Sequence, residues 1–141
     1  MARVKIDLPE KFIYQTQITL RISDINYNDH LGNDAVLTLA QEARLRFLNK
    51  HGFSELNIAG VGIIMVDAAV QYKAEGFYGD TLIIEVGIKD ITKTGCDMVY
   101  QITNIENEKV IAIVKTGIAF FDYQKRKVVT TPEEFLEIIK E

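Results

Sequence analysis

The chain has 141 residues, of which 48% are hydrophobic and 26% are charged, so its length and apolar content fit one domain with a single core, spanning residues 1–141. Its formal net charge is −4, and the one basic cluster is Lys125-Arg126-Lys127, which excludes an extended basic face for a nucleic acid. The single cysteine, Cys96, excludes an internal disulfide, and two histidines far from any zinc spacing predict no metal site. Because the sequence has no leader pattern and no run of about 20 apolar residues, we expect a soluble, cytoplasmic protein in a reducing compartment.

The first predicted strand covers residues 12–22, where β-branched and aromatic residues alternate loosely. A helix is predicted over residues 34–50 because its apolar residues recur at helical spacing. They form one stripe of Val36, Leu39, Ala40, Ala43 and Phe47, widened by Leu37 and Leu48. This helix is about 25 Å long and too apolar for a protein surface, so we expect other elements to wrap it.

Four extended runs follow, over residues 61–74, 81–92, 97–106 and 109–123, and turn residues such as glycine and asparagine separate them. Their alternating pattern predicts antiparallel strands with one core face. A short helix is predicted over residues 132–140, with Pro132 in its first turn. The order predicts an α+β fold, with an antiparallel sheet of about five strands wrapped around one long central helix. An uncovered sheet face and a free edge strand would favour aggregation, so we expect a homodimer or a homotetramer.

Three local motifs, in this order of elements, resemble the hotdog fold and specifically the 4-hydroxybenzoyl-CoA thioesterase-like family. The motifs are SDINYNDHLGND at residues 23–34, QEARLRFL at residues 41–48 and YKAEGFYGDTL at residues 72–82. The resemblance covers roughly residues 18–122. It implies an acyl-CoA thioesterase that hydrolyses an acyl thioester of coenzyme A or of acyl carrier protein. It implies no cofactor other than the coenzyme A of the substrate.

The first motif departs from the family at residue 26, where an asparagine stands in place of the family's catalytic aspartate. A carboxamide has no lone pair of useful basicity, so Asn26 cannot act as nucleophile or general base. Asn26 instead donates its amide to the thioester carbonyl or positions water, or it only caps the following turn through its side-chain oxygen. The family's Asn-Asn pair is also replaced, here by Gly32-Asn33.

The first-turn amides of the predicted helix, around Gly32, Asn33 and Asp34, would polarise a thioester carbonyl, and Gly32 would let the substrate approach the backbone. We therefore interpret these three residues as substrate-binding. The alternative is purely structural, with Gly32 supplying a positive φ and Asn33 acting as the helix N-cap.

Further candidates carry titratable side chains. Glu42 lies where the family's helix often has a base or nucleophile, and the alternative is an i,i+4 pair with Arg46 worth about 0.3 kcal/mol. His30 is either an acid or base, or fixes the loop by hydrogen bonds. Asp24 is a further candidate for binding substrate or acting as base. Asp67 interrupts an apolar run, where a carboxylate is costly to bury alone, so we expect it to face the acyl groove or a dimer contact.

The leading hypothesis is a thioesterase in which Asn26 and the helix amino terminus hold the carbonyl while Glu42 activates water. One alternative is an enoyl-CoA hydratase of the same fold, because Asp24, Asn26 and His30 resemble that family's signature, although with longer spacing and without its proline. Another is a non-catalytic module that binds an acyl thioester. The Lys125-Arg126-Lys127 cluster either meets the coenzyme's phosphates or forms a solvated turn.

Overall fold

The computed structural model describes residues 3–140, and the long elements follow the predicted order. In chain order the elements are β1 (Tyr14–Thr19), the 3-10 helix η1 (Ile22–Asp24), α1 (Asn33–Lys50), β2 (Gly62–Tyr72), β3 (Thr81–Lys89), β4 (Gly95–Asn104), β5 (Val110–Asp122), β6 (Lys127–Val128) and α2 (Glu133–Ile139). The elements η1 and β6 were not predicted, because one helical turn and a two-residue strand are too short to show a periodic pattern.

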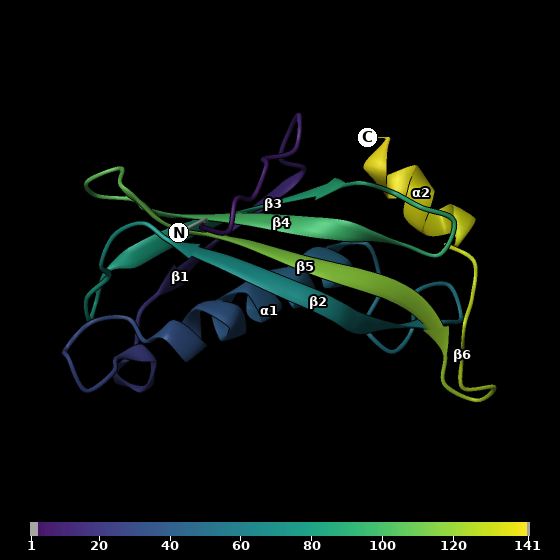
Figure 1. Cartoon of the computed structure of the whole chain (residues 1–141), viewed down its shortest axis with the longest axis horizontal. Coiled ribbons are helices and arrows are strands. Elements are labelled where there is room, and N and C mark those ends of the chain that lie inside the picture. The colour runs from purple at the N-terminus through teal and green to yellow at the C-terminus, as the bar shows by residue number, and fades with distance from the viewer. Residues whose placement is uncertain (1–2, 141) are drawn as a thin grey trace.

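The strands form one antiparallel sheet in the order β1-β3-β4-β5-β2, and β6 pairs with the end of β5. The sheet curves around α1, which runs along its concave side (Figure 1). Alternate residues of the three central strands are fully buried against the helix, among them Leu82, Ile84, Tyr100, Ile102 and Val114. The predicted antiparallel sheet wrapped around one long helix is therefore confirmed.

The helix α1 buries the predicted stripe, and Leu48 widens it as expected. Leu37 does not, because 41% of this residue is exposed. The side chains of Leu37 and Leu48 leave α1 in nearly the same direction. On this side of α1, however, the loop in which Phe53 donates a backbone hydrogen bond to Leu48 covers only the carboxyl-terminal half of the helix. The amino-terminal half of α1 is thus open on this flank.

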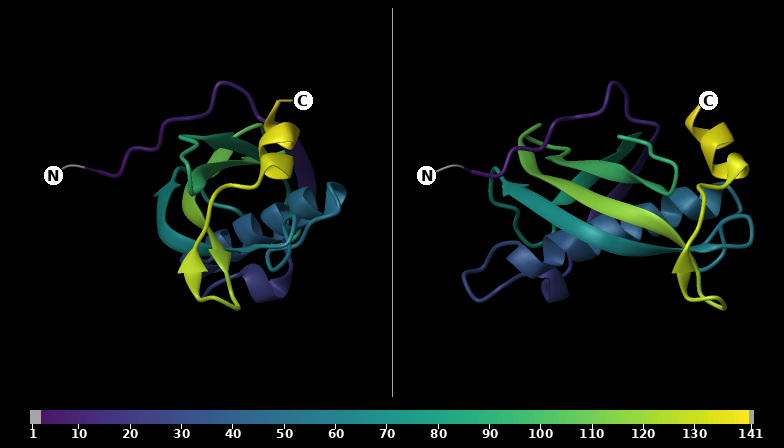
Figure 2. Two further views of the ribbon diagram at one scale, coloured as in Figure 1. Left: turned by 90° about the vertical axis from the view of Figure 1, so that its right-hand side faces the viewer. Right: turned by 45° about the vertical axis from the view of Figure 1, so that its right-hand side comes forward.

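The outer face of the sheet, away from α1, is crossed by residues 3–13 (Figure 2). The Ile6 amide donates to the Gln71 side chain at 3.0 Å, and a Cβ at Gly87 would collide with Pro9. This N-terminal segment therefore shields part of the face that the sequence left uncovered. None of the helices between residues 3 and 140 combines the length and apolar character needed to cross a bilayer.

The two edges of the sheet differ. At the β1 edge, Arg46 of α1 donates to the Thr16 hydroxyl at 2.8 Å and to the Gln17 carbonyl at 3.0 Å. The β2 edge is 11 residues long, and its register with β5 shifts between Met65 and Asp67, which makes Val66 a bulge. The β1 edge is therefore partly closed by a side chain of its own helix. The β2 edge is closed at its Gly62 end, where the Ile63 amide donates to the Glu55 carbonyl at 2.9 Å and the Tyr123 hydroxyl donates to the Ile63 carbonyl at 2.8 Å, and its next residues include the exposed Met65 and Val66.

Candidate active site

The polar junction between β1 and α1 folds as a tight loop pinned to the segment after β2. Inside the loop, the Asn26 amide donates to the His30 carbonyl at 2.8 Å and the Gly32 amide donates to the Asp24 carbonyl at 3.0 Å. The Leu31 amide donates to the Gly76 carbonyl at 2.7 Å. Two of the three motifs noted in the sequence therefore meet at the amino end of α1.

The side-chain oxygen of Asn26 accepts the Asn28 amide at 2.9 Å and the His30 amide at 3.4 Å, so it caps the loop. Its nitrogen donates to no other residue within the described part of the chain, 3–140. The side-chain oxygen of Asn26 therefore caps the turn, as the structural alternative predicted, and its side-chain nitrogen remains available to donate to a ligand.

Gly32 is the N-cap of α1, with φ −72° and ψ 149°. The structural alternative, a positive φ at Gly32 with Asn33 as N-cap, is wrong, and Asn33 is instead the first helical residue. The glycine is needed for space: a Cβ there would lie 2.8 Å from the Asp34 carboxylate and 3.4 Å from the Asn26 Cβ. Asn26 thus packs directly against the start of the helix.

A pocket of about 270 Å³ lies beside this helix start, on the β2 side. The candidates His30 and Asn33 line it, together with Leu31, Val36, Tyr72, Lys73, Ala74, Glu75 and Ile111. The Tyr72 hydroxyl donates to the Asn33 carbonyl at 3.3 Å, and His30 Nδ1 lies 3.1 Å from the Leu31 carbonyl oxygen. No motif of the sequence predicted Glu75 as a pocket residue, because it reaches the pocket of His30 only through the tertiary fold.

Asp24 is 5% exposed, and its carboxylate accepts the Arg21 amide at 2.8 Å. This bond caps η1, and Arg21 Nε also lies 3.6 Å from the same oxygen. Asp24 therefore holds the loop and does not line the pocket.

Glu42 lies away from the pocket. It is about nine residues, or roughly 14 Å, along α1 from Asn33, and its carboxylate pairs with Arg46 Nε at 2.8 Å. It lines a separate hollow of about 290 Å³ with β1 residues such as Gln17 and Thr19. The structure does not bring Glu42 together with Asn26 and His30. It shows the predicted alternative, in which Glu42 forms an i,i+4 pair with Arg46.

Asp67 lies on β2, where its carboxylate accepts Lys115 Nζ at 2.7 Å and the Gly117 amide at 3.1 Å. The hydrogen bond from Lys115 lowers the pKa of Asp67 below its usual value. Asp67 pairs with Gly117 at the bulge, away from the junction. The structure therefore gives the carboxylate a partner in its own sheet and separates it from the other candidates.

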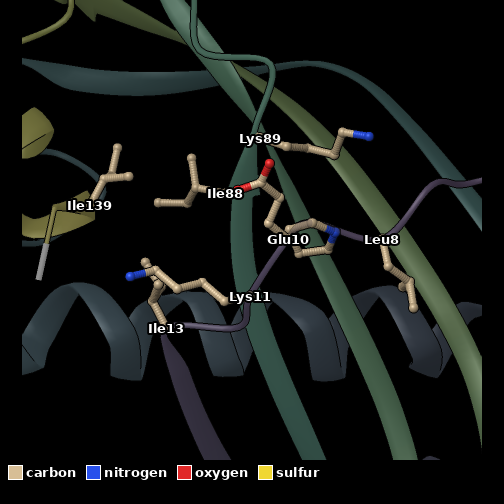
Figure 3. A pocket seen from close by; sticks show the side chains of 8 residues that line it. Leu8, Glu10, Lys11, Ile13, Ile88, Lys89 and Ile139 are labelled. Atoms are coloured by element: carbon tan, nitrogen blue, oxygen red, sulfur yellow. The ribbon is translucent and has the colours of Figure 1, made fainter.

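A larger cavity, of about 470 Å³, lies elsewhere, between the N-terminal segment, the end of β3 and α2 (Figure 3). It is lined by Leu8, Pro9, Glu10, Lys11, Ile13, Ile88, Lys89 and Ile139. Lys89 is at the opposite end of β3 from Thr81, roughly 26 Å away, and Thr81 is the end nearer the junction. No set of His, Cys, Asp and Glu between residues 3 and 140 is arranged to hold a metal ion.

The chain as a whole matches a known family. The family model of the thioesterase-like superfamily matches residues 20–139. A 1,4-dihydroxy-2-naphthoyl-CoA thioesterase from Synechocystis is similar in structure, with a TM-score of 0.83 and 18% identity over 91% of this chain and 96% of that one.

Two structures from Staphylococcus aureus are also similar. A DHNA-CoA thioesterase has a TM-score of 0.79 and 19% identity, over 89% of this chain and 87% of that one. A hypothetical protein in complex with CoA has a TM-score of 0.81 and 17% identity, over 96% of this chain and 86% of that one. At these identities the structures establish the shared fold and confirm the predicted hotdog architecture. The match of the family model establishes membership, and the chain belongs to the thioesterase-like superfamily.

Proposed function

We propose that this protein hydrolyses an acyl-coenzyme A thioester in the pocket at the amino end of α1. The observation that supports this proposal is the meeting of His30, Asn33 and Asn26 at the helix start, beside a pocket with an apolar wall. Family membership supports the reaction class. The similar structures, which include CoA thioesterases and a complex with CoA, support coenzyme A as the carrier in preference to acyl carrier protein.

In the proposed reaction the thioester carbonyl oxygen accepts hydrogen bonds from the first-turn amides of Asn33 and Asp34 and from the side-chain amide of Asn26. Amides at a helix amino terminus favour negative charge, and fixed donors stabilise the oxyanion as it forms. Gly32 leaves room for the Asp34 carboxylate and the Asn26 side chain, and so keeps the Asn26 amide beside the first turn of the helix.

His30 is the proposed base. The Leu31 carbonyl can only accept a hydrogen bond, so its contact with Nδ1 requires the proton to be on Nδ1, and Nε2 of the neutral ring then has a free lone pair. Nε2 takes a proton from water as the oxygen adds to the carbonyl carbon. The carbon–sulfur bond then breaks, and the imidazolium returns the proton to the coenzyme A thiolate, giving a carboxylic acid and a free thiol.

This assignment replaces Glu42 as the proposed base, since Glu42 is paired with Arg46 on the other flank of α1. It also disfavours the hydratase alternative, in which Asp24 and His30 would share water, because the Asp24 carboxylate is used to cap η1. We further propose that the reaction needs no redox cofactor, since hydrolysis changes no oxidation state, and no metal, since His30 and the helix amides take the roles of base and oxyanion donors. A cytoplasmic location is supported by the single, unpaired cysteine of the chain.

We also propose a homodimer formed by two β2 edges. Met65 and Val66 are 43% and 60% exposed on this edge, and its one charged side chain, Asp67, is neutralised by Lys115 of the same sheet. Long, apolar edges present unpaired backbone groups to a second strand. The other edge is less available because Arg46 caps it.

The test is a panel of acyl-CoA substrates with short, long and aromatic acyl groups, assayed for free thiol. Release of thiol from at least one of them, unchanged by a metal chelator, is the expected result. Hydration of crotonyl-CoA in place of hydrolysis would favour the hydratase. Binding of an acyl-CoA without any turnover would make the protein a binding module and would overturn the proposed activity.

A further inference from the structure

The cavity between the N-terminal segment, the end of β3 and α2 lies outside the proposed reaction site, and we name it the terminal cavity. Its volume is about 470 Å³, and residues 8–11, 13, 88, 89 and 139 line it. Lys89 in its wall lies roughly 26 Å along β3 from Thr81, the end of this strand nearer the pocket beside α1. The terminal cavity is therefore a separate site.

The inner wall of the terminal cavity is aliphatic. Ile13, Ile88 and Ile139 pack against the hydrophobic core, and each keeps part of its surface exposed. Leu8 is 45% exposed, and in Figure 3 it lies on the opposite side of the cavity from Ile139. Water in such a cavity has few polar groups to bond, whereas an aliphatic chain gains free energy by leaving bulk water for it. The wall therefore fits a ligand with a hydrocarbon chain.

The volume of the terminal cavity limits the length of that chain. Binding sites for small ligands measure about 300–1,000 Å³, and the terminal cavity falls inside this range. A methylene group is about as large as a water molecule, which occupies roughly 30 Å³ in the liquid. Because a bound ligand does not fill all of the space, an aliphatic chain of roughly ten carbons matches the cavity.

Three charged side chains stand around the terminal cavity, those of Glu10, Lys11 and Lys89, and their net charge is +1 in a chain whose formal net charge is −4. Lys89 Nζ donates to the Asp7 carbonyl at 3.4 Å, which uses one of the three donors of an ammonium group and leaves two for a ligand. A carboxylate carries a single negative charge at neutral pH, whereas a phosphate monoester carries about −1.5 to −2. The charge of the site therefore matches a carboxylate best.

We propose that the terminal cavity binds a free carboxylic acid with an aliphatic chain of roughly ten carbons. The chain lies against Ile13, Ile88 and Ile139, and the carboxylate lies at the lysine side chains. This inference stands apart from the proposed hydrolysis because it needs neither His30 nor Asn26, although a carboxylic acid is also the class of product that the reaction would release.

The first test follows the isoleucine methyl groups by NMR while decanoate is added to the full chain. We expect the signals of Ile13, Ile88 and Ile139 to shift together along one binding curve. Ile111 lines the pocket beside α1, so its signal reports decanoate bound there instead. Shifts at Ile111 without shifts at the three isoleucines of the terminal cavity overturn the proposal, and so does the absence of any shift.

The second test varies the chain length, with hexanoate, octanoate, decanoate and hexadecanoate below the concentrations at which they form micelles. Affinity at the terminal cavity should rise about fourfold with each methylene group up to decanoate, because each one is buried. Hexadecanoate should gain nothing further, because the cavity is then full. An affinity that keeps rising to hexadecanoate would indicate adsorption on an exposed apolar surface and would contradict the proposal.

The third test uses charged side chains that should act in opposite directions. Lys11→Gln with Lys89→Gln should weaken the binding of decanoate by up to about tenfold, as for two exposed ion pairs. Glu10→Gln should tighten it about twofold to threefold, because it removes a like charge. The control Lys109→Gln with Lys125→Gln removes two exposed lysines elsewhere and should leave the affinity as it is.

Two neutral or cationic probes complete the third test. Decanol has the same chain without the charge, so its affinity should be equal in all of these variants. Decylamine should bind more weakly than decanoate. Tighter binding of decylamine, or weaker binding of decanoate in Glu10→Gln, would assign the site to a cation and overturn the proposal.

The aliphatic wall is tested at Leu8, which lies outside the helices and strands, so that its replacement leaves the fold intact. Leu8→Gln should weaken the binding of decanoate about fivefold, because part of the apolar contact is lost. Val4→Gln is the matched control, since Val4 is 53% exposed in the same segment but does not line the cavity. Equal affinity in the two variants would show that the chain does not lie in the terminal cavity.

Discussion

Asn26 has its two side-chain atoms in different roles, since the oxygen caps the loop and the nitrogen is available as a donor. Asn26→Asp separates them, because a carboxylate keeps the acceptor for the Asn28 amide but loses the donor. We expect kcat to fall by about 10²–10³, as for loss of an oxyanion donor. Steady-state assays of the purified Asn26→Asp variant measure this fall in kcat. An increase in kcat would contradict the prediction, because it would mean that catalysis needs a carboxylate at this position.

His30 and Glu42 form a matched pair for a second experiment. His30→Gln should lower kcat by about 10²–10⁴, because it removes the proposed base. Glu42→Gln breaks only an exposed pair with Arg46 and should change kcat less than about threefold. The opposite ranking in the same assay would restore Glu42 as the base.

The buried thiol of Cys96 should make the free energy of unfolding depend on pH. Burial raises the pKa of the Cys96 thiol from 9.0 to about 12. Above pH 9 the unfolded thiol ionises while the folded one stays protonated, so the stability contribution is present below pH 9 and is lost as pH rises towards 12. The free energy of unfolding should fall by up to about 1.4 kcal/mol per pH unit.

Urea unfolding between pH 8 and 10 checks this slope, with Cys96→Ala as the control that should remove it. The range stops at pH 10 because burial also raises the pKa of Tyr100, which would add its own loss at higher pH. A slope that persists in Cys96→Ala would assign the dependence to another group.

Among the elements, α1 is tied to the sheet by a buried polar network as well as by its apolar stripe. Arg44 donates to Glu55 at 2.7 Å and to the Tyr100 hydroxyl at 2.9 Å, and Tyr100 in turn meets Thr116 at 2.8 Å. Arg44→Met leaves Glu55 without its cation and should lower the free energy of unfolding by about 2–4 kcal/mol. Urea denaturation measures it.

Glu42→Gln on the same helix is the comparison, because the pair that Glu42 forms with Arg46 is exposed and its loss should cost no more than about 1 kcal/mol. Similar losses in the two variants would show that the buried network adds nothing beyond a surface pair.

The long elements were predictable because each shows its own period in the sequence, as the stripe of α1 and the alternation of β3 do. The junction was predictable because its residues are contiguous. The roles within the site were not. Sequence spacing reports neither the place of Glu75 in the same pocket as His30 nor the capping by Asp24. Leu37 is exposed because the loop that covers this flank of α1 reaches only its carboxyl-terminal half.

For the whole molecule, the proposed dimer depends on the β2 edge. Val66→Lys places a charge on the exposed bulge and should convert the proposed dimer to a monomer, measured by light scattering after size exclusion. Ile91→Lys is the control, because Ile91 is similarly exposed, at 44%, but lies in the turn after β3. A wild-type protein that is monomeric at micromolar concentration would contradict the proposal.

The hydrogen bonds from the Arg46 guanidinium to Thr16 and Gln17 limit how many copies of the chain could join into one sheet. A sheet with two free edges can add copies without limit and form fibres, whereas a sheet with one free edge is complete once it has paired with a single copy. Replacing Arg46 with a residue that leaves the Gln17 carbonyl bare would therefore be expected to turn a closed pair into an open-ended polymer.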